Sequence, residues 1–203
     1  MSLEARGFER GEGGAADAVA VARPRQARRT RLEPWRAAWE LLHDLSVAVL
    51  FCFFLITFVA QAFRVQGTSM KPLLHDGDRI VVNKFVYRFQ SIARGDVVVF
   101  WYPRDPSTSF IKRVAGLPGD TVEMRLGHLY VNGREMPETY LAAEQRDLDS
   151  FPPTAITAGH YFVLGDNRRG SNDSRSWGEV PEKYIYGRAI LRFWPPTQLG
   201  LIR

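Results

Sequence analysis

The chain divides into one continuous apolar stretch and a longer part in which apolar and polar positions alternate. No charged residue occurs from Leu45 to Phe63, and the clearly polar side chains there are Ser46, Thr57 and Gln61. About 20 apolar residues match the hydrocarbon thickness of a bilayer. A core helix of a globular domain usually shows a polar face. We therefore expect residues 45–63 to form a single transmembrane helix.

A cleaved secretion signal is the alternative for this stretch. Ala60-Gln61-Ala62 has the small-x-small pattern of a cleavage site, and it follows an apolar run. However, the run begins late in the chain and is longer than the usual apolar region of a signal. We expect a retained anchor, with cleavage after Ala62 as the alternative.

Beyond residue 63, the pattern changes to short runs of β-branched and aromatic residues bounded by turns. Asp76-Gly77 and Asn132-Gly133 supply turn chemistry. Because no helical pattern separates the runs, residues 64–203 are predicted to form a mainly β domain, an antiparallel sandwich or barrel-like fold. Pro152-Pro153 indicates a long loop or insertion over 137–158. The expected strands are 79–83, 96–102, 109–115, 121–125, 129–131, 161–164 and 188–194.

The charge pattern predicts an orientation in the membrane. The chain carries a net charge of +5, and arginine dominates from Arg23 to Arg36, where Glu33 is the one acid. Arginine and lysine favour the cytoplasmic side, so we expect 1–44 to be a basic, largely disordered cytoplasmic tail and 64–203 to lie outside. Anionic lipid headgroups suit the arginines. We expect no nucleic acid partner, because no basic helix or stacking aromatic motif is present.

Several kinds of chemistry are disfavoured by the residues available. The single cysteine, Cys52, lies in the apolar stretch, which argues against a disulfide and a cysteine nucleophile. There is no H-E-x-x-H motif, nucleophile elbow or phosphate-binding glycine loop. We therefore expect no metal and no cofactor. The histidines, which lack metal-ligand spacing, are His43, His75, His128 and His160.

A serine and a lysine remain as candidates for chemistry. Ser69 follows the apolar stretch closely, and Lys112 lies in a predicted strand on the same face as Phe110 and Val114. Burial of an ammonium on an apolar face lowers its pKa and lets the amine act as a base near neutral pH. Such a base can activate a serine without a histidine. Taken singly, a turn serine and an edge-strand lysine are the simpler explanations.

Read together, four segments in order along the chain resemble the type I signal peptidases, the bacterial leader peptidase family of Ser-Lys serine endopeptidases. The resemblance spans Phe63 to Trp194. A serine followed by a methionine would be weak evidence alone, whereas four ordered segments make chance agreement very unlikely. The segments are Gly67–Leu74, Arg94–Pro103, Lys112–Asp120 and Gly165–Arg175.

The resemblance implies a membrane-bound peptidase that removes signal peptides from exported preproteins after small-x-small sites, close to the export machinery. It makes Ser69 the nucleophile, Lys112 the general base and Ser171 a group that hydrogen-bonds and orients the lysine. The supporting polar set would be Arg113, Asp166, Arg168, Asp173 and Arg175. Candidates for the walls of the substrate pockets are Val65, Met70, Leu74 and Ile111.

The sequence departs from the family pattern near the nucleophile. Some members have a serine two residues before it, which completes the oxyanion hole, and Gly67 stands there. The main-chain N–H of Ser69 remains as one donor, and Thr68 is a candidate for the second. Arg169 also stands where an acidic residue is common.

Three other interpretations compete. Self-cleaving repressors of the SOS response also use a Ser-Lys pair, but the apolar stretch argues against them. A pilus or plasmid-transfer maturation peptidase would share both the anchor and the pair. An inactive tethered β domain that binds exported peptides would need none of Ser69, Lys112 and Ser171. Trimming of a preprotein at a small-x-small site separates this binding module from an enzyme.

Overall fold

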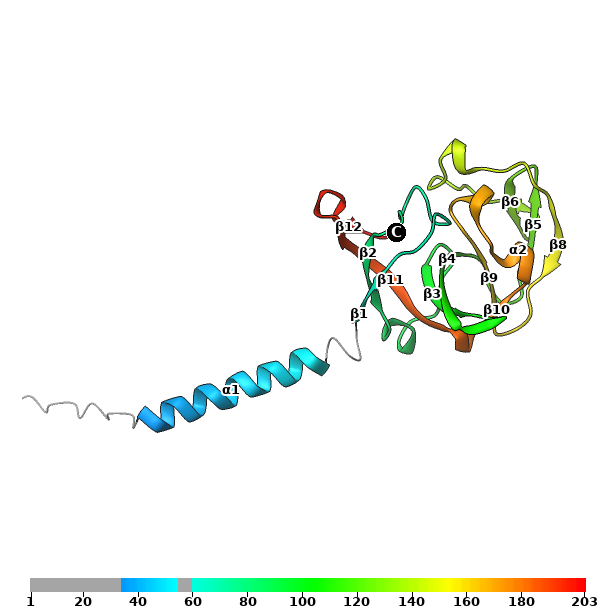
Figure 1. Ribbon diagram of the computed structural model, residues 1–203. Coiled ribbons are helices and arrows are strands. Elements are labelled where there is room, and N and C mark those ends of the chain that lie inside the picture. The colour runs from blue at the N-terminus through cyan, green and yellow to red at the C-terminus, as the bar shows by residue number, and fades with distance from the viewer. Residues whose placement is uncertain (1–33, 55–59) are drawn as a thin grey trace, which may run out of the picture. The chain divides into compact units, whose positions relative to one another are not determined.

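A computed structural model describes residues 34–54 and 60–203 of the chain (Figure 1). It contains a long helix, α1 (Pro34–Phe54), and a β-rich domain. The domain confirms the predicted mainly β, antiparallel architecture. Its strands are β1 (Ala60–Arg64), β2 (Arg79–Asn83), β3 (Val97–Tyr102), β4 (Asp105–Gly116), β5 (Thr121–Arg125), β6 (His128–Val131), β7 (Arg134–Glu135), β8 (Phe151–Ala155), β9 (His160–Leu164), β10 (Val180–Pro181), β11 (Ile185–Trp194) and β12 (Gly200–Leu201), with a short helix α2 (Ser174–Trp177).

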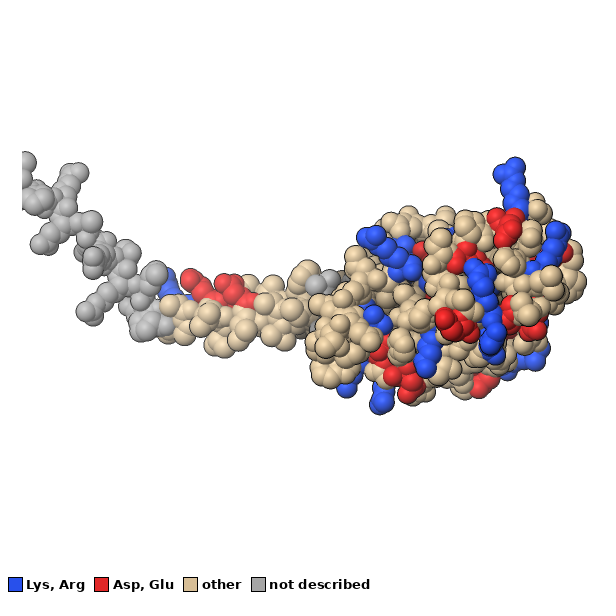
Figure 2. Space-filling model, turned by 90° about the horizontal axis from the view of Figure 1, so that it is seen from above, with Lys and Arg blue, Asp and Glu red and all other residues tan. Residues whose placement is uncertain are grey.

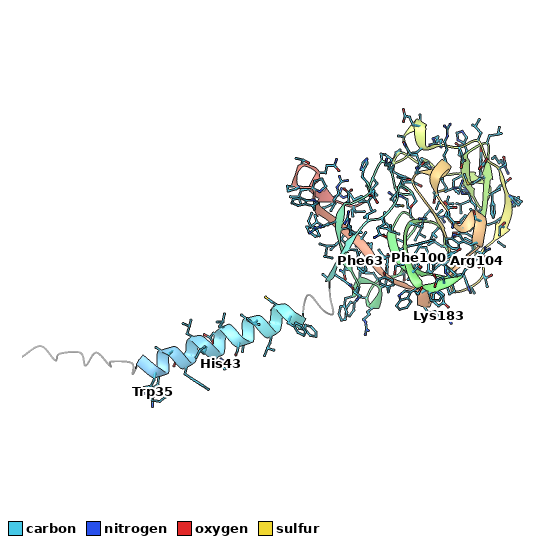
Figure 3. The ribbon with its side chains drawn as sticks, viewed as in Figure 1. Trp35, His43, Phe63, Phe100, Arg104 and Lys183 are labelled. Carbon is cyan, nitrogen blue, oxygen red and sulfur yellow. The ribbon has the colours of Figure 1, made fainter. Side chains whose placement is uncertain are left out.

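Helix α1 is long and apolar enough, from Trp35 to Phe54, to cross a bilayer. Proline suits the first position of a helix, so Pro34 is a natural start. Most of the face of α1 seen in Figure 2 is uncharged, and Trp35 and His43 project from it in Figure 3. Trp39, Leu42 and other large apolar side chains of α1 are exposed. Such a surface is suited to lipid rather than to water.

The bounds of the predicted membrane span and tail need correction. Residues 34–44, expected in the tail, belong to α1. Ala60–Arg64, mostly expected in the span, form β1 and pair with β2 in antiparallel register, with Ala62 opposite Val81. Pairing with β2 satisfies the main chain of these residues, so a helix is not needed there. The tail prediction for residues 1–33 and the span residues 55–59 lie outside the described residues.

The domain is built from two antiparallel sheets. The larger has the order β1-β2-β11-β3-β4-β9-β10, with β12 on β11, and the smaller the order β7-β6-β5-β8. In Figure 1, β5, β6 and β8 lie at the opposite side of the domain from β1 and β2. The long strands β4 and β11 each pair with several neighbours, which ties the sheet together.

Strands in the centre of the domain are buried on both faces. Along β3, Val97 and Val99 belong to one apolar cluster, whereas Val98 and Phe100 belong to another. Successive side chains of a strand point to opposite faces, so β3 separates two cores. Phe100 lies in the interior of the domain in Figure 3. This packing makes β3 a rigid support for its neighbour β4 and for the side chains that β4 carries.

The stretch 137–158, expected to be a long loop or an insertion, contains the strand β8. Thr154 of this strand is opposite Val122 of β5, and β8 forms an edge of the smaller sheet. Proline lacks an N–H, and an edge strand needs hydrogen bonds on one side only. Pro152 and Pro153 are therefore compatible with a strand at this position.

Candidate active site

Ser69 lies in the loop that joins β1 to β2. The N–H of Val65 donates to the carbonyl of Asp78 at 2.8 Å, which closes the base of the loop. Just after Ser69 the chain makes a tight turn, in which the N–H of Leu74 donates to the carbonyl of Met70 at 2.9 Å. The loop is thereby fixed on both sides of the serine.

Met70 and Leu74, predicted as walls of the substrate pocket, lie in the core instead. They are 1% and 0% exposed and pack in one cluster with Ile80 and Val82. Both side chains therefore point toward the interior. Their role in the structure is to anchor the loop that carries Ser69.

A cavity of about 570 Å³ opens beside Ser69. Val65 and Ile111, the other two predicted wall residues, both line it. Sequence reasoning missed the contributions of Phe63 and Phe110; the available signals were their nearness to Val65 and Ile111 and the position of Phe110 on the same strand face as Lys112. The full lining is Phe63, Arg64, Val65, Gln66, Gly67, Thr68, Ser69, Ile80, Val99, Ser109, Phe110, Ile111, Lys112, Gly170 and Asn172.

Lys112 reaches Ser69 from the neighbouring strand β4. Its Nζ lies 2.8 Å from Ser69 Oγ, and it also donates to the carbonyl of Ile111 at 3.0 Å. The side chain is 4% exposed. A neutral amine has two N–H groups and one lone pair. With one N–H held by Ile111, the lone pair can face the serine hydroxyl.

Burial lowers the pKa of Lys112 from 10.5 to about 8. The removal of the ammonium from water is the main cause, and the carboxylates of Asp173 and Asp166 oppose it by favouring the charged form. At pH 7 about a tenth of the lysine is then neutral, against less than about a thousandth for an ordinary lysine. The site therefore holds an amine that can accept a proton near neutral pH.

Ser171 does not make the hydrogen bond predicted for it. Its Oγ is buried and has no hydrogen-bond partner among the described residues. The hydroxyl packs against Gly165, where a Cβ would lie 2.2 Å from Ser171 Oγ and 2.5 Å from the carbonyl oxygen of Ser69. Gly165 thus allows the segment that bears Ser171 to approach the nucleophile closely, while the orienting role of Ser171 stays a prediction.

Arg113, the residue after the lysine, forms a buried bidentate pair with Asp166. Its Nε and Nη2 donate to the two carboxylate oxygens at 2.9 and 2.7 Å, and its Nη1 donates to the carbonyl of Gly95 at 2.9 Å. The guanidinium also stacks 4.1 Å from the centre of the Tyr140 ring. These contacts connect β4 to the segment after β9, directly behind Lys112.

Asp173 organises the start of α2. It accepts hydrogen bonds from the main-chain N–H of Gly165 at 3.0 Å and from Nε of Arg175 at 2.8 Å. Arg175 also pairs with Asp147 at 2.5 Å. Desolvation opposes the charge of Arg175, but its two carboxylate partners raise its pKa overall.

Arg168 pairs with Glu138, and both side chains are buried. Sequence reasoning missed Glu138 and Asp147, because both fall in the stretch 137–158, which is predicted to be a loop or insertion. The surplus of arginines over acids in Gly165–Arg175 was the available signal, since buried arginines require acidic partners.

Replacement of Asp166 by alanine is expected to lower the free energy of unfolding by about 3–5 kcal/mol, because it leaves the Arg113 guanidinium buried without its partner. Denaturant unfolding followed by tryptophan fluorescence measures this effect. Glu123→Ala is the matched control, since it breaks a surface pair with Arg125 and should cost far less. Equal effects of the two changes would contradict the importance of the buried pair.

Comparison with known proteins identifies the family. The family model described as "Signal peptidase, peptidase S26" matches residues 38–194. "Probable signal peptidase I-2" of Synechocystis is 38% identical over 88% of this chain and 84% of that protein. "Signal peptidase I" of Leptolyngbya laminosa is 39% identical over 79% of this chain and 82% of that protein.

A relative from another organism and a solved structure are also similar. "Signal peptidase IB" of Staphylococcus aureus is 36% identical over 77% of this chain and 89% of that protein. A crystal structure of a signal peptidase I from Enterococcus faecalis, 35% identical, covers 49% of this chain and 97% of that chain with a TM-score of 0.43. Because the family model matches most of the chain and relatives at 36–39% identity cover more than two thirds of it, the chain belongs to the signal peptidases of peptidase family S26.

Proposed function

We propose that the chain removes signal peptides from exported preproteins, with Ser69 as nucleophile and Lys112 as general base. The observation that carries this proposal is the 2.8 Å distance between Lys112 Nζ and Ser69 Oγ at the edge of the cavity. The two groups are within the range in which a base takes a proton from a hydroxyl. The lowered pKa of Lys112 makes its amine available for this step.

The reaction proceeds in two halves. Ser69 Oγ attacks the scissile carbonyl carbon while its proton passes to Lys112 Nζ, and the negative charge on the carbonyl oxygen is met by the N–H of Ser69. The C–N bond then breaks, and the protonated lysine gives its proton to the leaving amine. Water, deprotonated by Lys112, attacks the acyl-enzyme and releases the signal peptide as a carboxylate, which restores Ser69.

An exposed edge of β4 suits an extended substrate. The pairing of β4 with β9 begins only at Arg113, opposite Leu164, whereas β3 pairs with β4 as far as Asp105. The residues before Arg113, from Ser109 to Lys112, line the cavity. A substrate strand added here would gain main-chain hydrogen bonds and place its side chains in the cavity. Apolar walls such as Val65 and Ile111 suit the small residues before the cut.

The apolar helix α1 serves as the membrane anchor of the chain. From the arginines between Arg23 and Arg36, we infer that the tail is cytoplasmic and that the β domain faces the extracytoplasmic side, with the tail near anionic lipids. The preprotein is itself held in the membrane by its apolar segment as it leaves the export machinery. Tethering both to one surface raises their effective concentration.

The test is cleavage of a purified preprotein by the full chain in detergent or lipid, with the new N-terminus located by mass spectrometry. We expect a single cut after a small residue. Exchange of that residue for phenylalanine should lower kcat/KM by about 100-fold or more, since a misfit in a shallow pocket displaces the scissile carbonyl from Ser69. The matched control places phenylalanine at the next position upstream, whose side chain in an extended substrate points to the other face. Absence of any cleavage by the chain would favour a peptide-binding role.

A further inference from the structure

The side chain and main chain of Asn167 hold both peptide groups that flank the nucleophile. Its Nδ2 donates to the carbonyl of Thr68 at 3.2 Å, and its main-chain N–H donates to the carbonyl of Ser69 at 2.9 Å. Asn167 follows β9, whereas Thr68 and Ser69 lie in the loop after β1. These two bonds are thus a direct link between the nucleophile loop and the segment that bears the supporting acids.

The hydrogen bond from Asn167 to the Thr68 carbonyl also fixes the direction of the Ser69 N–H. The Thr68–Ser69 peptide is trans, since the cis bonds of the described chain are Lys71–Pro72 and Trp194–Pro195. In a planar trans peptide, the C=O and the N–H point in opposite directions. An amide that holds the Thr68 carbonyl on one side therefore directs the Ser69 N–H to the other.

The N–H of Ser69 has no hydrogen-bond acceptor among the residues that the structure describes. Ser69 itself lines the cavity. A main-chain donor that is oriented but unpaired, next to the nucleophilic oxygen, is suited to receive the charge that develops on a carbonyl oxygen. The turn after Ser69 gives a second restraint, because the N–H of Lys71 donates to the same Thr68 carbonyl at 3.2 Å.

Gly170 leaves the space that the Asn167 amide occupies. A Cβ at position 170 would lie 2.8 Å from Asn167 Nδ2 and 3.4 Å from Cγ. The N–H of Gly170 also donates to the carbonyl of Asn167 at 3.1 Å, which closes a tight turn around the amide. Any larger residue at 170 would push the amide away from Thr68.

We propose that Asn167 is a positioning residue that aims the Ser69 N–H at the oxyanion, and that Gly170 is the residue that makes room for it. Asn167 does not touch the reacting atoms and acts through the Thr68–Ser69 peptide. The inference rests on the proposed function of Ser69. It supplies a reason for the glycine in this turn and for an asparagine that has no part in the proton transfers.

The test compares steady-state cleavage of a preprotein by the wild-type chain and by Asn167→Ala. We expect kcat to fall by about 10- to 100-fold, because a misdirected donor loses most of its effect on the transition state, while KM changes by less than about threefold. The pH at which activity rises should stay that of the wild type, since Lys112 is untouched. Gln198→Ala, which removes an exposed amide outside the cavity, is the matched control and should leave kcat unchanged.

Gly170→Ala gives an independent measurement. Alone, it should lower kcat by about 10-fold, but in the Asn167→Ala background it should lower kcat no further, because no amide remains to be displaced. An equal effect of Gly170→Ala in both backgrounds would mean that the new methyl group acts on the substrate, and this would overturn the inference. Should Asn167→Ala fail to fold, Asn167→Asp takes its place, because it removes the Nδ2 donor and keeps the shape of the side chain. The value compared with wild type is then kcat on the high-pH plateau, and the same fall is expected.

The two proposals fail in different ways. If the wild-type chain cleaves no preprotein, the proposed function is wrong. If the wild type cleaves and Asn167→Ala, with a wild-type melting temperature, retains kcat within about twofold, only the role of Asn167 is wrong. A parallel loss of kcat and of melting temperature in Asn167→Ala and Asn167→Asp would likewise overturn it, by assigning the asparagine to stability alone.

Discussion

Replacement of Ser69 by alanine is expected to reduce the cleavage of a preprotein by about 10⁴-fold or more, because it removes the atom that attacks the scissile carbonyl. The cavity should keep its shape, since the anchors of the loop, Met70 and Leu74, are untouched. The variant should therefore still bind a preprotein. Rates of product formation, followed by gel and mass spectrometry, measure the loss.

Ser91→Ala provides the matched control for this prediction. Ser91 is exposed and does not line the cavity beside Ser69, so the same chemical change there should leave cleavage at the wild-type rate. Circular dichroism of both variants checks that the β domain is folded. More than about 1% of wild-type activity in pure, folded Ser69→Ala would mean that another group carries out the attack.

The strands that could be predicted from the sequence are those with clear local signals. The expected bounds 79–83 and 121–125 agree with β2 and β5, because both runs contain β-branched residues and are bounded by turns. β4 is longer than expected, since its first residues, Asp105 to Thr108, are polar and exposed. The first residues of β4 show no alternation of apolar and polar positions from which a strand could be predicted.

Five of the described strands were not expected: β7, β10 and β12, which are two residues long, and β1 and β8, whose surroundings concealed them. β1 continues directly from an apolar stretch, so that hydropathy alone joins Ala60–Phe63 to the membrane span. Its strand character depends on the partner β2, which follows only after the loop 65–78. β8 contains two prolines and is stabilised by its position at a sheet edge, next to β5. In both cases a tertiary contact decides the local structure.

In the candidate site, too, some features follow from sequence patterns and others depend on tertiary contacts. The proximity of Ser69 and Lys112 agrees with an expectation based on family motifs and on strand periodicity. The inward direction of Met70 and Leu74 depends on the conformation of the turn after Ser69, which nearness in sequence does not reveal. The role proposed for Asn167 depends on a contact across 99 positions, which no local pattern contains.

Replacement of Lys112 by methionine is expected to lower kcat by about 10⁴-fold or more, because methionine keeps the apolar stem but cannot accept the proton of Ser69. The 2.8 Å contact between Nζ and Oγ is lost with the amine. Lys183→Met is the matched control, since Lys183 is exposed at the outside of the domain (Figure 3). That variant should cleave at the wild-type rate, and near-normal cleavage by Lys112→Met would refute the assignment of the base.

The wild-type enzyme should show the titration of the same amine. Lys112 with a pKa of about 8 is protonated at lower pH and cannot then act as a base. The value of kcat/KM should therefore rise with pH through about 8 and level off above it. An ordinary lysine would place this rise near 10.5, and a histidine near about 6.5. A rise at either of these pH values would contradict the buried lysine as the group that controls the rate. A rise near pH 8 that is absent from Lys112→Met would assign the burial, the lowered pKa and the catalytic role to one side chain.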